Sequence, residues 1–363
     1  MANNHHVCFV NSLRDLGGAE LWFLDAARGL RDRGIATSLI AQPGTPLLER
    51  ARALALPTAA IPIRFDGAPW TLAKLGSHFR RSGVTALVCN LTKDLKAAGL
   101  AGMLAGVPVR LASRESDFPL KDKRYYRWYF QRVATGVLVN SVATRQTVLG
   151  SVPWLDPARV HLLYKGIDVE RFRPRGDDLA GRAPVVGFVG QLIARKGLDC
   201  LMAAWERLDR QGGPIRPTLR LAGEGPLRPQ LEAWRASLAH PARVELLGFV
   251  EDVPGFWHGC RCAVLPSLAE GFGLAAAEAA ACGVPVVATQ TSSLPELVHH
   301  GATGLLVPVD RPAALAAALS ELLQDPVRCR TLGAAGRDLV ASRFDHRRTL
   351  DQLQRLVCPE VPA

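Results

Sequence analysis

Two glutamates, Glu270 and Glu278, stand eight positions apart and enclose a Gly-x-Gly turn that leads into an alanine-rich stretch. If both lay on one helix, a rise of about 1.5 Å per residue would separate them by about 12 Å along the axis. A sugar nucleotide has a similar length, so one carboxylate could bind a sugar ring and the other a ribose. A helix that starts after Gly273 would offer unpaired N–H groups and a favourable dipole to the diphosphate between them. The alternative is an acidic turn followed by an ordinary helical glutamate.

The residues around this pair resemble the E-x7-E signature of the retaining glycosyltransferases of family 4, which have the GT-B fold. Other segments that match this family in order and spacing are 189–190 with 196–197, 222–227, 247–250, 283–289, 295–296 and 301–310. The resemblance is dense over residues 185–310 and thinner over residues 7–175. It implies an α/β protein of two Rossmann-like, doubly wound domains that face a cleft, with a C-terminal helix that crosses back to the first domain.

The resemblance also implies roles for individual residues. Glu278 would bind the ribose hydroxyls of a nucleotide sugar, and Glu270 would hold hydroxyls of the sugar that is transferred. Lys196 would bind the diphosphate, because a site without a metal ion needs a cation to stabilise the leaving group. Further residues that the resemblance assigns to the donor are Gly17, Gly18, Gln191, Arg195, Phe249, Gly271, Phe272, Gly273 and Leu274.

Gly17 and Gly18 follow the first predicted strand and precede a helix that begins near Leu21. Glycine permits positive φ angles and a close approach of the backbone to a ligand. In the family, this loop lies against the phosphates and sugar of the donor, near the acceptor. An ordinary turn before a helix is the alternative.

Some positions depart from the family pattern. Gln191 stands where an arginine is common, so a second cation for the diphosphate is absent unless Arg195 supplies it. Ser292 and Ser293 replace the usual pair of glycines before a Pro-Glu motif, and serine adopts positive φ angles less easily than glycine. Lys165 replaces the asparagine of an N-G-I-D motif. Each change is compatible with the fold and could mark a subfamily.

Many family members carry a histidine beside the reacting sugar, late in the first domain. The corresponding segment here contains Arg114 and Glu115, and we expect Arg114 to act there as a catalytic residue together with Glu270 and Lys196. This segment and the polar loop at 90–94 each follow a predicted strand. Because ligands bind at the carboxyl ends of strands in such sheets, both segments are expected to line the acceptor pocket. Surface loops with capping roles are the alternative.

Short apolar runs alternate with amphipathic stretches along the chain, which is typical of βαβ units and parallel sheets. The predicted strands are 7–10, 37–41, 86–89, 109–113 and 136–140 in the first half, and 185–189, 218–222, 244–247, 262–265, 286–288 and 304–307 in the second. A linker rich in proline, glycine and charge at 173–184 separates the two sets. The predicted domains are 1–175 on the acceptor side, 176–343 for the nucleotide sugar, and 344–363 as the returning helix.

Length and composition suit this organisation. A chain of 363 residues can form two domains with separate cores. No apolar run approaches the roughly 20 residues that span a bilayer, and the N-terminus does not resemble a secretory signal. The eight cysteines are scattered, and Cys260 and Cys262 lack the spacing and the second pair of a zinc site. We expect reduced cysteines, no metal ion and a cytoplasmic location.

The net charge of +11 is unevenly distributed, since residues 1–175 carry +12 and residues 176–363 carry −1. This favours an anionic partner for the first domain, although an arginine-rich, solvated surface would have the same charge. The segment 121–132 combines cations with aromatic residues, as helices at anionic membrane surfaces do. Alternatively, its rings pack on the sheet and its cations are solvated. Nucleic acid is disfavoured because no nucleic-acid-binding motif is present.

The sequence therefore predicts a retaining glycosyltransferase that moves a hexose from a nucleoside-diphosphate sugar to an acceptor hydroxyl, without a cofactor. The expected acceptor is an intermediate of lipopolysaccharide, another cell-envelope glycan or a glycolipid, and peripheral contact with the inner face of the membrane is left open. One alternative is a soluble synthase of a disaccharide or of glycogen. Another is a homologue that binds nucleotide sugars without catalysis. An NAD-dependent enzyme is disfavoured because no strand precedes a G-x-G-x-x-G motif.

Overall fold

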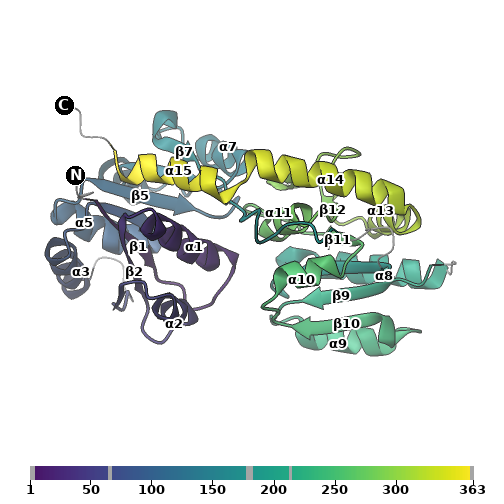
Figure 1. The fold of residues 1–363 in the computed structure, drawn as a ribbon. Coiled ribbons are helices and arrows are strands. Elements are labelled where there is room, and N and C mark those ends of the chain that lie inside the picture. Colours follow the sequence, from purple (N-terminus) through teal and green to yellow (C-terminus); the bar gives the residue numbers. More distant parts are fainter. Residues whose placement is uncertain (1–4, 64–67, 177–182, 212–214, 360–363) are drawn as a thin grey trace. The chain divides into compact units, whose positions relative to one another are not determined.

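The computed structural model describes residues 5–63, 68–176, 183–211 and 215–359, so residues 177–182 of the predicted linker lie outside the described residues. The chain divides into two compact units, Met1–Lys165 with Arg347–Ala363 and Gly166–His346. Each unit contains one parallel β-sheet with helices packed against it (Figure 1).

The first sheet has the strand order β3-β2-β1-β4-β5-β6-β7, and all its strands are parallel. Its strands are β1 His6–Asn11, β2 Ala36–Ala41, β3 Thr58–Ala60, β4 Ala86–Cys89, β5 Val109–Arg114, β6 Gly136–Val139 and β7 Val160–Leu162. The five strands predicted from the sequence are confirmed, with ends that shift by a residue at most. The two edge strands β3 and β7 are missed because each has only three residues, too few to show a periodic pattern.

Helices cover both faces of this sheet. Cys8 and Val10 of β1 belong to one hydrophobic cluster, whereas Val7 and Phe9 belong to another. Because side chains alternate along a strand, the two clusters lie on opposite faces. The helical segments of the unit are α1 Gly18–Asp32, α2 Pro46–Ala53, α3 Pro69–Arg81, α4 Thr92–Asp94, η1 Leu95–Gly99, α5 Leu100–Leu104, α6 Arg124–Trp128, η2 Tyr129–Val133, α7 Val142–Ser151, η3 Pro157–Arg159 and α15 His346–Val357.

The second sheet has the order β10-β9-β8-β11-β12-β13 and is also parallel. All six predicted strands are confirmed, as β8 Val185–Val189, β9 Thr218–Ala222, β10 Val244–Gly248, β11 Cys262–Leu265, β12 Val286–Thr289 and β13 Gly304–Val307. Its core includes Trp205 and Leu319, which are both buried. The helical segments are η5 Ala194–Lys196, α8 Leu198–Gln211, α9 Arg228–Ser237, η6 Pro241–Arg243, α10 Val253–His258, α11 Leu274–Ala281, α12 Leu294–Leu297, α13 Pro312–Gln324 and α14 Pro326–Arg343.

The final helix, α15, is part of the first unit, as the GT-B pattern predicts. Leu350, Leu353 and Val357 are buried in the same hydrophobic cluster as residues of α1. Gly29 of α1 permits this approach, because a Cβ there would overlap the side chain of Leu350. Arg33 adds a salt bridge to Asp351, with 2.7 Å between Nη1 and Oδ1. The helix is therefore an integral layer of the first unit.

The sequence places the first domain boundary at residue 175, whereas the structure groups residues 166–175 with the second unit. Ile167 explains this grouping, because its backbone pairs with the segment before α15. The N–H of Ile167 donates to Phe344 O (2.7 Å), and the N–H of His346 donates to Ile167 O (3.0 Å). The two chain crossings between the units thus lie side by side at residues 165–167 and 344–347.

We expect Leu353→Ala to lower the free energy of unfolding by about 2 to 5 kcal/mol, because it opens a cavity under α15. Gln352→Ala is the matched control, since Gln352 is an exposed neighbour on the same helix and should change stability by less than about 0.5 kcal/mol. Urea denaturation of both variants measures the difference. Equal effects would contradict the integration of α15 into the core.

Candidate active site

The second sheet reverses its strand order between β8 and β11. Ligands of doubly wound sheets bind at such a switch point, beyond the carboxyl ends of the strands. The loop after β8 carries Gln191, Arg195 and Lys196, and the loop after β11 carries Glu270 and residues 271–273. The structure therefore brings these predicted donor-binding residues to one edge of the second sheet.

Glu270 and Lys196 contact each other directly. The Lys196 Nζ forms a salt bridge with Glu270 Oε1, which also accepts a hydrogen bond from Ser267 Oγ (2.9 Å). The second carboxylate oxygen lies 3.8 Å from Arg195 Nη1. Glu270 is only 5% exposed, and a buried charge of this kind requires partners. Glu270, which is predicted to bind the sugar, and Lys196, which is predicted to bind the diphosphate, thus form one charged cluster.

Arg195 is anchored to the loop that carries Glu270. Its Nη1 donates to Ala269 O (3.0 Å), and its carbonyl accepts from the N–H of Leu268 (2.9 Å). Gln191, the position where the family often has arginine, is exposed. A positive charge therefore stands beside Glu270 at residue 195, although residue 191 is neutral.

Two glycines allow the loops after β8, β9 and β11 to pack closely. Gly197 has φ +67°, and a Cβ there would overlap the carbonyl oxygen of Pro266. Gly223, after β9, has φ +147°, and a Cβ there would overlap the carbonyl oxygen of Gly190. Larger residues would separate these loops, so the position of Lys196 depends on backbone contacts as well as on its salt bridge.

Helix α11 begins as the sequence predicts, at Leu274, with Gly273 as its N-cap at φ 94° and ψ 49°. Glu278 lies on this helix and is half-buried, whereas Glu270 lies in the loop before it. The separation of about 12 Å for two glutamates on one helix therefore does not apply. The first turn of α11 has backbone N–H groups without partners within the helix, which suits an anion.

The serine pair is accommodated without loss of the loop conformation. Ser292 adopts φ 48°, the left-handed region that glycine usually supplies. Ser293 is buried, and its Oγ donates to Phe272 O (2.8 Å) and Glu270 O (3.5 Å). The second serine thus ties the loop that carries Glu270 to the start of α12, which is a contact that glycine could not make.

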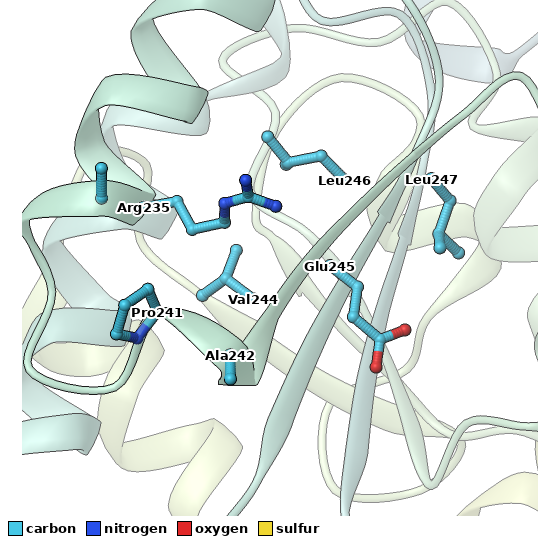
Figure 2. A pocket seen from close by; sticks show the side chains of 8 residues that line it. Arg235, Pro241, Ala242, Val244, Glu245, Leu246 and Leu247 are labelled. Carbon is cyan, nitrogen blue, oxygen red and sulfur yellow. The ribbon is translucent and has the colours of Figure 1, made fainter.

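Phe249, which the family resemblance assigns to the donor, is exposed directly after β10. An open hollow of about 690 Å³ runs along the outer side of β10 and ends at Leu247 (Figure 2). Val244 and Leu246 lie on the α9 side of the strand with Arg235, and Glu245 lies on the other. Leu247 belongs to the matched segment 247–250, but the hollow is lined by none of the residues of the charged cluster around Glu270.

The first sheet has its switch point between β1 and β4, and a buried carboxylate lies there as well. Glu20, in the first turn of α1, accepts hydrogen bonds at Oε1 from Asn11 (3.2 Å) and Asn90 (3.1 Å). Its other oxygen accepts from the N–H of Gly17 (3.0 Å). Gly17 has φ −132°, so it does not use the positive φ that glycine permits. The hydrogen bonds of Glu20 hold the loop instead.

A second buried ion pair lies at the carboxyl ends of β5 to β7. Lys165 is 4% exposed, and its Nζ forms a salt bridge with Glu115 and lies 5.4 Å from the centre of the Trp22 ring. Ser113 Oγ donates to Glu115 Oε1, and Asn140 Nδ2 donates to Glu115 O (3.1 Å). The substitution of lysine in the N-G-I-D motif therefore has a structural partner, Glu115.

Arg114 ends β5 and is half-buried. Its Nη2 donates to Phe118 O (2.9 Å), whereas its Nε has no hydrogen-bond partner among the described residues. Burial lowers the pKa of this guanidinium from its ordinary value. The catalytic role that the sequence assigns to Arg114 stays a prediction.

Asp94, which the sequence interpretation mentions only as part of a polar loop, is fully buried beside this switch point. The N–H of Leu91 donates to its Oδ2 (3.0 Å), and burial raises the pKa of the carboxyl to about 7. Ser12 and Lys93 oppose this shift, but neither Ser12 Oγ nor Asp94 Oδ1 makes a bond of hydrogen-bonding geometry. One acid at the edge of the first sheet therefore titrates near neutral pH.

Among the described residues, no group of three or more His, Cys, Asp and Glu side chains could hold a metal ion. The described helices also include none that is long and apolar enough to cross a membrane. All eight cysteines are free, and only Cys358 is partly exposed.

We expect Asp94→Asn to be more stable than the wild-type protein at about pH 8 and to lose this advantage at about pH 5. The pKa of the folded carboxyl lies above that of the unfolded chain, so the wild-type protein loses about 3 kcal/mol of stability, at about 1.4 kcal/mol per pH unit, as the pH rises from 5 to about 7. Asparagine cannot ionise and can still accept from Leu91. Thermal unfolding at both pH values measures the effect. A stability difference that does not change with pH would contradict it.

Comparisons with known proteins agree with this architecture. The model of Glycosyltransferase Family 4 matches residues 16–171, and that of Glycosyl transferases group 1 matches residues 183–325. The alpha-maltose-1-phosphate synthase of Mycolicibacterium smegmatis is 32% identical over 283 residues, which cover 68% of this chain and 72% of that protein. The D-inositol 3-phosphate glycosyltransferase of Rhodococcus erythropolis is 30% identical over 368 residues, which cover 94% of this chain and 79% of that protein.

A solved structure shows the same fold. Anabaena Alr3699/HepE in complex with UDP and glucose aligns with a TM-score of 0.81 and 20% identity over 97% of this chain and 99% of that chain. The parallel sheets of seven and six strands, the returning helix and the two family matches lead to one conclusion. The chain belongs to the glycosyltransferases of family 4 and has the GT-B fold.

Proposed function

We propose that this glycosyltransferase moves a hexose from a nucleoside-diphosphate sugar to an acceptor hydroxyl, with retention of the anomeric configuration. The observation that carries the proposal is the buried pair of Glu270 and Lys196 at the switch point of the second sheet. Helix α11 follows in the chain, with Gly273 at its N-cap and Glu278 one turn further on. Glu270, Lys196 and Glu278 would then bind the sugar, the diphosphate and the ribose of a sugar nucleotide.

Each group has a defined task in this proposal. Lys196 and the N-terminus of α11 stabilise the negative charge of the diphosphate. Glu270, oriented by Ser267 and Lys196, accepts hydrogen bonds from sugar hydroxyls. Glu278 binds the two ribose hydroxyls. The Gly17–Gly18 loop and Arg114 lie on the acceptor side, in the first unit.

The proposed reaction needs no cofactor. The bond between the anomeric carbon and the diphosphate oxygen breaks, and a bond from that carbon to the acceptor oxygen forms on the same face. The leaving phosphate oxygen takes the acceptor proton, so a pair of catalytic carboxylates of the hydrolase kind is not required. The chain contributes position and charge stabilisation.

UDP is the first nucleotide to test. HepE, which shares this fold, was solved in complex with UDP and glucose, and this supports a uridine donor and a glucose-like sugar. The exposed Phe249 offers a ring at the segment proposed to meet the base.

We propose a cell-envelope glycan, lipopolysaccharide or glycolipid intermediate as the acceptor. The charge of +12 in residues 1–175 supports an anionic acceptor. The second candidate acceptor is a small phosphorylated sugar or polyol, in which case this protein would be a soluble synthase. The names of two relatives, which refer to maltose-1-phosphate and inositol 3-phosphate, support this candidate. The eight free cysteines support a cytoplasmic location for either reaction.

A homologue that binds nucleotide sugars without catalysis is less well supported. The residues that suggest this alternative are the neutral Gln191 and the pair Ser292 and Ser293. Arg195 places a cation beside Glu270, and Ser292 keeps the left-handed conformation. Neither substitution therefore disrupts the donor loops.

We expect Glu270→Gln to lower kcat/KM by about 100- to 1,000-fold, because the carboxylate that orients the sugar becomes neutral. The assay follows UDP release from UDP-glucose and UDP-galactose with glucose 1-phosphate, inositol 3-phosphate and lipopolysaccharide core as acceptors. The anomeric signal of the product in NMR spectra reports its configuration, and retention is expected.

Glu321→Gln is the matched control, since Glu321 forms only a surface salt bridge with Arg328 (2.8 Å) in the same unit. It should leave the rate unchanged. An inverted product would contradict the mechanism. Absence of UDP release with every acceptor, in a protein that binds UDP-glucose, would support the non-catalytic alternative.

A further inference from the structure

Residues 118–132 carry a basic and aromatic surface of the first unit that the proposed reaction does not use. Three of its large side chains are exposed, Phe118 by 54%, Tyr125 by 45% and Trp128 by 43%. Its exposed cations are Lys121, Lys123, Arg124, Arg127 and Arg132. We call these eight residues the outer face. Exposed aromatic residues gathered in this way mark an interaction surface.

The aromatic residues of this segment divide between the core and the solvent. Phe130 and Val133 are fully buried, and Tyr126 and Tyr129 pack against the same hydrophobic cluster. Their spacing is that of one helix face along α6 and η2. Packing in the core therefore explains Tyr126, Tyr129 and Phe130, in agreement with the alternative that the rings of this segment pack on the sheet. It does not account for Tyr125 and Trp128.

The segment 118–132 contains one acidic residue, the exposed Asp122, and two more, Glu115 and Asp117, precede it. Glu115 pairs with Lys165, Asp117 accepts a hydrogen bond from Thr147, and Asp122 accepts one from Trp154 Nε1 (2.7 Å). Among the described residues, no salt bridge involves the five cations of the outer face. Five cations against the single acidic residue Asp122 leave this segment with a net positive charge.

Neighbouring side chains hold the exposed rings in place. Lys96 Nζ lies 5.1 Å from the centre of the Tyr125 ring, and the Tyr125 and Tyr126 ring centres are 4.7 Å apart. The Trp128 ring contacts that of Tyr129 edge to face, with 5.0 Å between their centres. Binding through these rings would lose little conformational entropy.

We propose that the outer face binds the surface of a bilayer that contains anionic lipids. Tyrosine and tryptophan rings enter the boundary between headgroups and acyl chains, and arginine and lysine meet the anionic headgroups. The net positive charge and the fixed rings fit this partner better than a protein or a nucleic acid. Membrane binding of this kind does not depend on the proposed reaction.

The outer face also adjoins the edge of the first sheet. Phe118 O accepts a hydrogen bond from Arg114, the last residue of β5, so the surface begins where the predicted acceptor side ends. A lipid-linked acceptor could therefore reach that edge from the bilayer. This last step rests on the proposed function.

Sedimentation of the full-length protein with phosphatidylcholine vesicles, with and without phosphatidylglycerol, tests the surface. The wild-type protein should bind only the anionic vesicles, and less tightly at high salt. The triple variant Arg124→Gln/Arg127→Gln/Arg132→Gln should bind the anionic vesicles about 100-fold more weakly, because each lost cation lowers the affinity about fivefold. Tyr125→Ser/Trp128→Ser should also weaken it. Trp70→Ser is the matched control, since Trp70 on α3 is 72% exposed and lies outside the outer face.

Three results would overturn the proposal. The first is that the wild-type protein does not bind anionic vesicles at low salt. The second is that both outer-face variants bind as tightly as the wild-type protein. The third is that the protein binds a single-stranded oligonucleotide more tightly than it binds vesicles. Thermal unfolding of each variant shows that the fold is retained. UDP release from UDP-glucose is measured separately, so a protein that lacks vesicle binding but turns over its donor refutes the membrane surface alone.

Discussion

The salt bridge between Glu270 and Lys196 is the interaction on which the proposed donor site of this protein depends. The two residues come from loops that follow β8 and β11, on either side of the switch point of the second sheet. A carboxylate that is 5% exposed is costly unless a cation and hydrogen bonds compensate it. The pair therefore fixes the distance between the loops, and Gly197 permits the close approach that the pair requires. Removal of either charge would leave the other buried without its partner.

The switch point of the first sheet also contains a buried carboxylate whose burial is compensated by hydrogen bonds. Glu20 is buried between β1 and β4, and two asparagines and one backbone N–H satisfy it in place of a cation. Further along the same edge, Lys165 and Glu115 neutralise each other. The positive charge of the first half is therefore partly neutralised at this edge. Part of it lies on the outer face, where aromatic rings accompany it.

Much of the fold was predictable because buried parallel strands appear in the sequence as short apolar runs between turn residues. The strands β3 and β7 were missed because three half-buried residues at a sheet edge leave no such pattern. Gly273 as the start of α11 was predictable from its position before an alanine-rich stretch. Gly17 does not use the positive φ that glycine permits, since its backbone is extended and a hydrogen bond to Glu20 holds it, and its assignment to the donor stays a prediction.

The partners of the charged residues could not be predicted in the same way. The residue types indicated ligands for phosphate and sugar, but the contact of Lys196 with Glu270 spans 74 positions and needs the folded sheet. The pairs of Glu20 with Asn90 and of Lys165 with Glu115 are likewise distant in the chain. Asp94 gave no signal, because its raised pKa follows from complete burial and not from its neighbours in sequence.

We propose that the edge of the second sheet binds a nucleoside diphosphate sugar through Glu278 and Lys196. The most direct measurement is the thermal shift of the wild-type protein and of Glu278→Ala with UDP, GDP and ADP and their common sugar conjugates. A ligand at 100 times its Kd stabilises the folded protein by about 2.7 kcal/mol. We expect one nucleotide, with UDP the first candidate, to stabilise the wild-type protein and not the variant. Equal stabilisation of both proteins, or of neither by any nucleotide, would contradict it.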